Sequence, residues 1–204
     1  MSKYAYIHKA NTPSLLFLVA ANGIVIFIAV HEQWAASTLL WTYWLQSVII
    51  GIFQAAKMAA LEKFSTASVQ VNGHPVSPTP ELKRKIVLFF LFHYGFFHFI
   101  YAIFLAQFFR DIAWPAILLS GSIFFANHAL SFFMNLAETR TRTYNIGKMM
   151  LFPYLRIVPM HIVLVFGAMF LGNTPLLIFF LVLKTAADAF THIIEHRRTK
   201  APLR

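Results

Sequence analysis

The sequence predicts an all-α protein, a polytopic bundle of about six transmembrane helices with both termini in the cytoplasm. The first observation is composition: of 204 residues, 59% are hydrophobic and 12% are charged. A soluble domain of this length cannot bury so much apolar surface. The second observation is that apolar segments of about 17–23 residues follow one another, and each is long enough to cross a bilayer. The chain is therefore expected to form a single transmembrane domain.

Interface and turn residues separate these segments. Trp41, Tyr43 and Trp44 open the second segment as an aromatic belt. Trp114-Pro115 begins the fourth, and Gly172-Asn173-Thr174-Pro175 makes a tight turn into the sixth. The expected spans cover residues 14–30, 38–58, 86–108, 114–137, 153–171 and 175–194, and the one sizeable connection is a cytoplasmic loop at 59–85.

The basic residues set the expected orientation. The chain carries a formal net charge of +10, and nearly all cations outside the spans fall on one side of the predicted topology. Arg110 is the exception. The positive-inside rule then places both termini in the cytoplasm. The expected location is the inner, cytoplasmic membrane of the cell. Because topology accounts for these cations, we expect lipid bilayer and no nucleic acid as a partner. The chain has no cysteine, so any metal would need His, Asp or Glu ligands.

Polar side chains inside the apolar segments mark a candidate site. Lys184, Asp188 and His192 recur every four residues and form one stripe on the last predicted helix. Charges near a bilayer centre are costly, about 2.5–3.5 kcal/mol each on insertion scales. A rise of about 1.5 Å per residue places polar side chains from four spans in one layer, about 9–13 Å from the cytoplasmic ends. These side chains are His93, His128, His161 and Asp188.

Three histidines and a carboxylate are ligands suited to a divalent metal, Zn or non-haem Fe. A pair of histidines on facing helices would alternatively hold a b-type haem. Candidate relay or outer-shell residues are His98, Asn127, Ser131, Asn135, Lys57, Arg156, Lys184 and His192. No compact ligand motif such as H-E-x-x-H is present to single out a metal site. The same residues are also compatible with a purely structural network or with a proton or solute pathway.

The intramembrane polar residues are compatible with other functions. A small proton-coupled transporter or channel would use Asp188 and His192 as its relay. A non-catalytic scaffold would bind another membrane protein, and a homo-oligomer is equally compatible. Ser120-Gly121-Ser122 with His98 suggests a serine hydrolase, but no G-x-S-x-G motif supports it. Small residues at this density more often allow helices to approach closely.

Three stretches together resemble a family of small, uncharacterised bacterial and archaeal membrane proteins, a domain of unknown function. They are Y-W-L-Q-S-V-I-I-G-I-F from Tyr43, F-H-Y-G-F-F-H from Phe92, and P-Y-L-R-I from Pro153 continuing to K-T-x-x-D-x-x-x-H-x-x-E-H from Lys184. The family often has an acidic residue in place of Gln46 and Asn in place of Gln54. The resemblance implies a recurring membrane module and assigns no activity.

Overall fold

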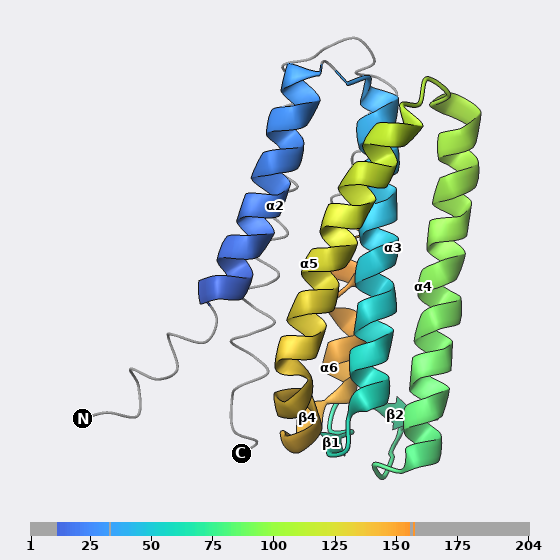
Figure 1. The fold of residues 1–204 in the computed structure, drawn as a ribbon. Coiled ribbons are helices and arrows are strands. Elements are labelled where there is room, and N and C mark those ends of the chain that lie inside the picture. Colours follow the sequence, from blue (N-terminus) through green and yellow to red (C-terminus); the bar gives the residue numbers. More distant parts are fainter. Residues whose placement is uncertain (1–11, 33, 156, 158–204) are drawn as a thin grey trace.

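The computed structural model describes residues 12–32, 34–155 and 157, which form a bundle of long helices (Figure 1). The long helices are α2 (Thr12–His31), α3 (Ala36–Ala60), α4 (Pro80–Phe108) and α5 (Trp114–Thr141). Helix α3 lies at the centre: it packs against both α4 and α5, and α2 contacts α5. The all-α prediction is confirmed, and α3 is positioned to hold any site between helices.

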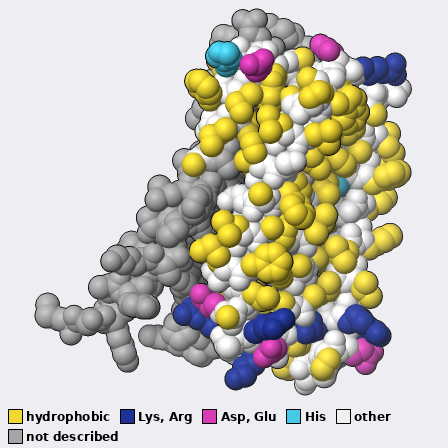
Figure 2. Space-filling view, viewed as in Figure 1, with side chains coloured by type: hydrophobic (Ala, Val, Ile, Leu, Met, Phe, Trp, Pro, Cys, Tyr) yellow, Lys and Arg dark blue, Asp and Glu magenta, His cyan; other side chains and the backbone are white. Residues whose placement is uncertain are grey.

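Three described helices are long and apolar enough to cross a membrane: Ser37–Ala60, Pro80–Phe108 and Trp114–Thr141. Large hydrophobic side chains on α4 and α5 remain exposed, as Figure 2 shows for one face of the bundle. Such a surface is typical of a protein whose helices contact lipid. The chain is a membrane protein on these grounds. The predicted spans 153–171 and 175–194 lie almost wholly outside the described residues.

The predicted loop 59–85 is shorter in the structure, because α4 begins at Pro80. Thr79 is the N-cap, and its side chain accepts a hydrogen bond from the backbone N–H of Leu82 at 3.2 Å. Pro80 occupies the first turn, where its missing N–H costs nothing, and Glu81 suits the helix N-terminus. The apolar pattern starts only at Ile86, so hydropathy alone placed the helix start too late.

Lys83, one of the cations between the predicted spans, also contacts the end of a helix. Its Nζ donates to the carbonyl oxygens of Ala59 at 3.1 Å and Leu61 at 2.7 Å. These carbonyls belong to the end of α3, where helical acceptors lack partners within the helix. The start of α4 therefore caps the end of α3.

The connection between α3 and α4 forms a small cap at one end of the bundle. Strands β2 (Gln70–Val71) and β3 (His74–Pro75) pair antiparallel around Asn72 and Gly73, which both have positive φ (52° and 79°). Positive φ at both positions is the type I′ hairpin geometry that Asn-Gly favours. Strand β1 (Phe64–Ser65) pairs in parallel with β4 (Tyr144–Asn145), which follows α5. This pairing connects the loop between α3 and α4 to the segment that follows α5.

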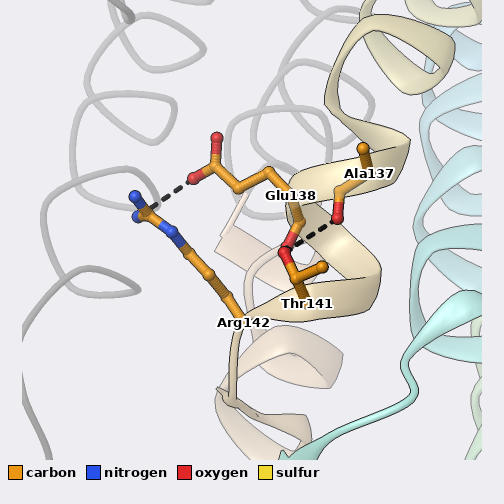
Figure 3. Close-up of polar contacts among 4 residues, drawn as sticks. All are labelled: Ala137, Glu138, Thr141 and Arg142. Carbon is orange, nitrogen blue, oxygen red and sulfur yellow. Dashed lines mark hydrogen bonds and ion pairs between the residues drawn. The ribbon is translucent and has the colours of Figure 1, made fainter.

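Helix α5 ends near this cap. The Thr141 hydroxyl donates to the Ala137 carbonyl at 2.9 Å, and Arg142 pairs with Glu138 at 3.0 Å (Figure 3). A short helix, α6 (Ile146–Leu151), then begins with Asn145 as its N-cap. The prediction placed the next helix near Pro153. The Asn145 cap starts a helix earlier, and a turn at Phe152–Pro153 follows it.

Candidate functional site

A buried polar network joins α3 to α4 in the middle of the bundle. The Ser47 hydroxyl lies 2.8 Å from Nε2 of His98 and 2.9 Å from the Tyr94 hydroxyl. The Tyr94 hydroxyl also donates to the Ser47 carbonyl at 2.9 Å. All three residues are buried. Buried polar groups without hydrogen bonds are costly, so these contacts stabilise the network against its apolar surroundings.

The protonation pattern of His98 follows from its neighbours. Its Nδ1 lies 2.8 Å from the backbone carbonyl of Tyr94. A carbonyl oxygen only accepts hydrogen bonds, so Nδ1 carries the proton. In the neutral imidazole, Nε2 is then the acceptor and receives the Ser47 hydroxyl proton. The ring of His98 also stacks on Tyr94, with centroids 4.3 Å apart.

Two further contacts on α3 hold α4 in place. Nε1 of Trp44 donates to the His98 carbonyl at 2.8 Å. Gly51 lies against the Tyr94 ring: a Cβ there would be 2.4 Å from Tyr94 Cε1. Because Ser47 and Gly51 are one turn apart, as are Tyr94 and His98, the two helices match turn by turn. Gly51 thus allows the approach that brings the hydroxyls within hydrogen-bonding distance.

Apolar clusters close the network at both ends. Towards the cap, Met58, Leu61, Phe90 and Ile146 are buried in one cluster that also includes Tyr94. Towards the opposite end of α4, a second cluster contains Leu40, Tyr101, Leu105 and Phe109. Hydrophobic side chains therefore flank the polar layer on both sides along the bundle. Electrostatic interactions are strong in such apolar surroundings.

A second polar contact lies nearer the cap. Nδ1 of His93 is 2.8 Å from the hydroxyl of Tyr154, which follows α6. The His93 ring stacks on Phe89 and meets Phe97 edge-on. The side-chain amide of Gln54 donates to the Met149 carbonyl at 2.8 Å. These bonds attach α3 and α4 to the segment around α6.

The two described members of the predicted metal site lie on different helices and have different partners. His93 is on α4 and contacts Tyr154, whereas His128 is on α5 and stacks on Phe53 of α3 with centroids 6.1 Å apart. Helix α3 lies between α4 and α5 (Figure 1). Among the described residues, no group of three or more His, Cys, Asp or Glu side chains gathers. His161 and Asp188 lie outside the described residues.

The other predicted residues are placed as follows. His98 is in the network, and Lys57 and Asn127 are half-buried. Nδ2 of Asn135 donates to the Ser131 carbonyl within α5, so this pair bonds along its own helix. The relay and outer-shell candidates outside the described residues are Arg156, Lys184 and His192.

The hydroxyl partner of His98 is not the serine weighed from the sequence. Ser120 and Gly121 are buried, and a Cβ on Gly121 would meet Leu45 Cδ2 at 2.5 Å. This is the close helix approach that the small residues favoured. Ser47 takes the hydroxyl position instead. In the sequence, Ser47 and Gly51 are four residues apart, as are Tyr94 and His98. This matched spacing is the signal that could have identified Ser47.

The Ser47–His98 pair has the contact of a nucleophile and its base, with the Tyr94 carbonyl orienting the imidazole. Acyl transfer also needs hydrogen-bond donors for the developing oxyanion. Ser47 lies in the interior of α3, where backbone N–H groups are used in helix hydrogen bonds. The backbone of α3 around Ser47 therefore supplies no free donors for an oxyanion.

The three stretches singled out in the sequence meet at this region. Trp44, Ser47 and Gly51 come from the first, His93, Tyr94 and His98 from the second, and Tyr154 from the third. One family model, described as a family of unknown function (DUF6498), matches residues 7–204. The resemblance to an uncharacterised family is thereby confirmed. No curated protein and no solved structure matches the chain.

Proposed function

Since the chain belongs to DUF6498, a family of unknown function, we propose its function from the geometry: it is a small membrane protein that passes protons, as a proton-coupled transporter or channel. One observation carries the proposal. The Ser47 hydroxyl links a tyrosine hydroxyl to a histidine nitrogen in a buried layer between two apolar clusters. Ionisable residues inside a membrane domain are functional by default, because they are costly to keep there.

The network accommodates both charge states of His98. With neutral His98, Ser47 donates to Nε2, and the single Tyr94 hydroxyl proton is shared between Ser47 Oγ and the Ser47 carbonyl. With protonated His98, Nε2–H donates to Ser47 Oγ, Ser47 donates to the Tyr94 oxygen, and Tyr94 donates to the Ser47 carbonyl. Every proton has an acceptor in both states, so the change needs only hydroxyl rotation. Imidazole exchanges protons near neutral pH, and this pairing suits a relay.

Proton flux into liposomes tests the proposal. The full chain is reconstituted with a pH-sensitive dye inside, and a pH gradient is imposed. We expect wild-type flux above empty liposomes and a loss of about 10²-fold in His98→Gln, as for removal of a positioned proton-transfer group. Ser47→Ala should also reduce flux, whereas Ser120→Ala, a buried serine on α5, should retain it. Flux that persists in folded His98→Gln and Ser47→Ala proteins would refute the relay.

A second candidate is the metal or haem site of His93, His128, His161 and Asp188. The favouring observation is the hydrogen bond between His93 Nδ1 and the Tyr154 hydroxyl. Ligating histidines usually bond through their second nitrogen to an oriented partner, leaving the other for the metal. Elemental analysis and an absorption spectrum of purified protein test this candidate. Stoichiometric Zn or Fe lost in His93→Ala supports it, and their absence from the wild type sinks it.

The topology we propose has six spans with both termini in the cytoplasm. Support comes from the distribution of cations and from the three long apolar helices. Because the chain has no cysteine, single-cysteine variants report position cleanly. An impermeant maleimide should label Arg110→Cys in intact cells or right-side-out vesicles, and should label Ser68→Cys only after the membrane is opened. The reverse pattern would invert the proposed orientation.

A further inference from the structure

The first turns of α4 carry a basic group directly beside a long exposed apolar strip. Arg84 is exposed, and Leu88, Phe92 and Phe96 follow it at four-residue intervals on the same helix face. Phe92 is 78% exposed, and Phe99 and Ile103 continue the exposed surface along α4. We refer to Arg84 with Leu88, Phe92 and Phe96 as the α4 strip.

The other cations of this turn already have partners. Lys85 pairs with Glu81 at 2.8 Å, and Lys83 donates to the carbonyls that end α3. Within the described part of the chain, no ion pair holds Arg84. Basic side chains gather at the end of the bundle where α4 begins (Figure 2). Arg140 and Lys148 are also exposed there, on or near the ends of α5 and α6. The local charge favours an anion.

We propose that the α4 strip binds an anionic phospholipid, with its phosphate on Arg84 and an acyl chain along Leu88, Phe92 and Phe96. A guanidinium presents a planar set of donors that matches a phosphate group. A helix rises about 1.5 Å per residue, so Leu88, Phe92 and Phe96 lie progressively deeper than Arg84. The α4 strip therefore continues from the headgroup level into the hydrocarbon region. A free phosphate would use only Arg84 and leave the apolar part without a role.

The proposal goes beyond proton transfer, because the α4 strip is on the outer surface of α4 and the network is buried against α3. Anionic lipids concentrate in the cytoplasmic leaflet and attract basic residues at the helix ends. The α4 strip adds a defined apolar contact to that general attraction. This combination predicts a site that retains lipid, rather than only a membrane that is locally negative.

Native mass spectrometry of the full chain in detergent measures this site. The probes are phosphatidylglycerol, phosphatidylcholine with the same chains, and inorganic phosphate. We expect phosphatidylglycerol to bind at least fivefold more tightly than phosphatidylcholine. Arg84→Gln should weaken it about fivefold, as expected for one cation near an anionic surface. Arg110→Gln, a matched exposed arginine at the opposite end of α4, should leave the affinity unchanged.

A second variant tests the apolar part. Phe92→Ser changes an exposed side chain, so it should keep the fold, and it should reduce the retention of phosphatidylglycerol while leaving inorganic phosphate unaffected. Equal binding of the two lipids, or unchanged affinity in Arg84→Gln, would overturn the proposal. It would also be overturned if inorganic phosphate competed fully with the lipid, which indicates a simple anion site, or if Phe92→Ser instead abolished a dimer, which indicates a second copy on the α4 strip.

Discussion

At the scale of single residues, small side chains decide how closely α3 approaches its neighbours. Gly51 faces the Tyr94 ring on α4, and Gly121 of α5 faces Leu45. In membrane bundles, close packing of this kind replaces much of the hydrophobic driving force that water provides elsewhere. A hydroxyl–imidazole hydrogen bond needs a separation near 2.8 Å, so the Ser47–His98 contact depends on the absence of a methyl group at position 51.

Gly51→Ala should destabilise the packing of α3 against α4. The added Cβ would lie 2.4 Å from Tyr94 Cε1, so the helices must separate or the ring must move. We expect a loss of about 1–3 kcal/mol in the free energy of unfolding, the usual cost of overpacking. Denaturation in mixed micelles measures it. Gly95→Ala, beside Tyr94 but with nothing within 4 Å of its Cβ, is the control and should not destabilise; equal losses in both would contradict the packing argument.

At the scale of elements, helix ends are fixed by caps that lie outside the apolar segments. Thr79, Pro80 and Glu81 begin α4, and Asn145 begins α6 through a hydrogen bond from the Lys148 N–H at 3.0 Å. The hydrophobic pattern locates the middle of each of the four long helices well. It misses these ends because capping depends on polar side chains bonding to the first backbone N–H groups.

Thr79→Ala should destabilise α4 at its start. The substitution removes the acceptor for the Leu82 N–H and costs about 1 kcal/mol. Hydrogen exchange of the amides in the first turn of α4 should accelerate, with little change in α5. Thr141→Ala is the control, because its exposed hydroxyl bonds to a carbonyl near the end of α5. Unchanged exchange in that turn of the Thr79→Ala protein would show that the Thr79 cap does not stabilise the start of α4.

The ion pair at the end of α5 should matter much less. Glu138 and Arg142 are spaced by four residues, and the Arg142 side chain is 52% exposed (Figure 3). Exposed pairs of this kind contribute about 0.3–0.5 kcal/mol. Glu138→Gln should therefore change the unfolding free energy by no more than that, and less at high salt. A loss above about 1 kcal/mol would mean that this pair belongs to a larger charge network.

At the scale of the whole molecule, the cap and the bundle are one packed unit. The cluster around Met58 and Phe90 includes Ile146 and Met149, so side chains from α3, α4 and α6 share it. Gln54 adds a buried polar link from α3 to the Met149 carbonyl. Gly147 fits against Ser68 and Val69 of the loop, where a Cβ would lie 2.6 Å from Ser68 Oγ. The segment after α5 is thus held against the same end of the bundle.

Gln54→Leu should loosen this attachment. The Met149 carbonyl would lose its donor in a buried position, at a cost of about 1–3 kcal/mol. Hydrogen exchange should rise in residues 146–155 and change little near the opposite end of α4. Gln54→Asn, the residue expected at this position from the family resemblance, is the informative comparison. An unchanged exchange pattern in Gln54→Leu would show that apolar packing alone holds α6.

The sequence by itself determined that this is an all-α membrane protein and where the middles of its four long described helices lie, because runs of apolar residues are local properties. It also selected His93, His98 and His128 as polar residues inside helices. Matching depth, however, does not determine which side chains meet. The structure places His98 beside Ser47 and puts His93 and His128 on helices either side of α3. Only the tertiary structure decides this, because contact depends on how each helix is rotated and how closely residues such as Gly51 let it approach.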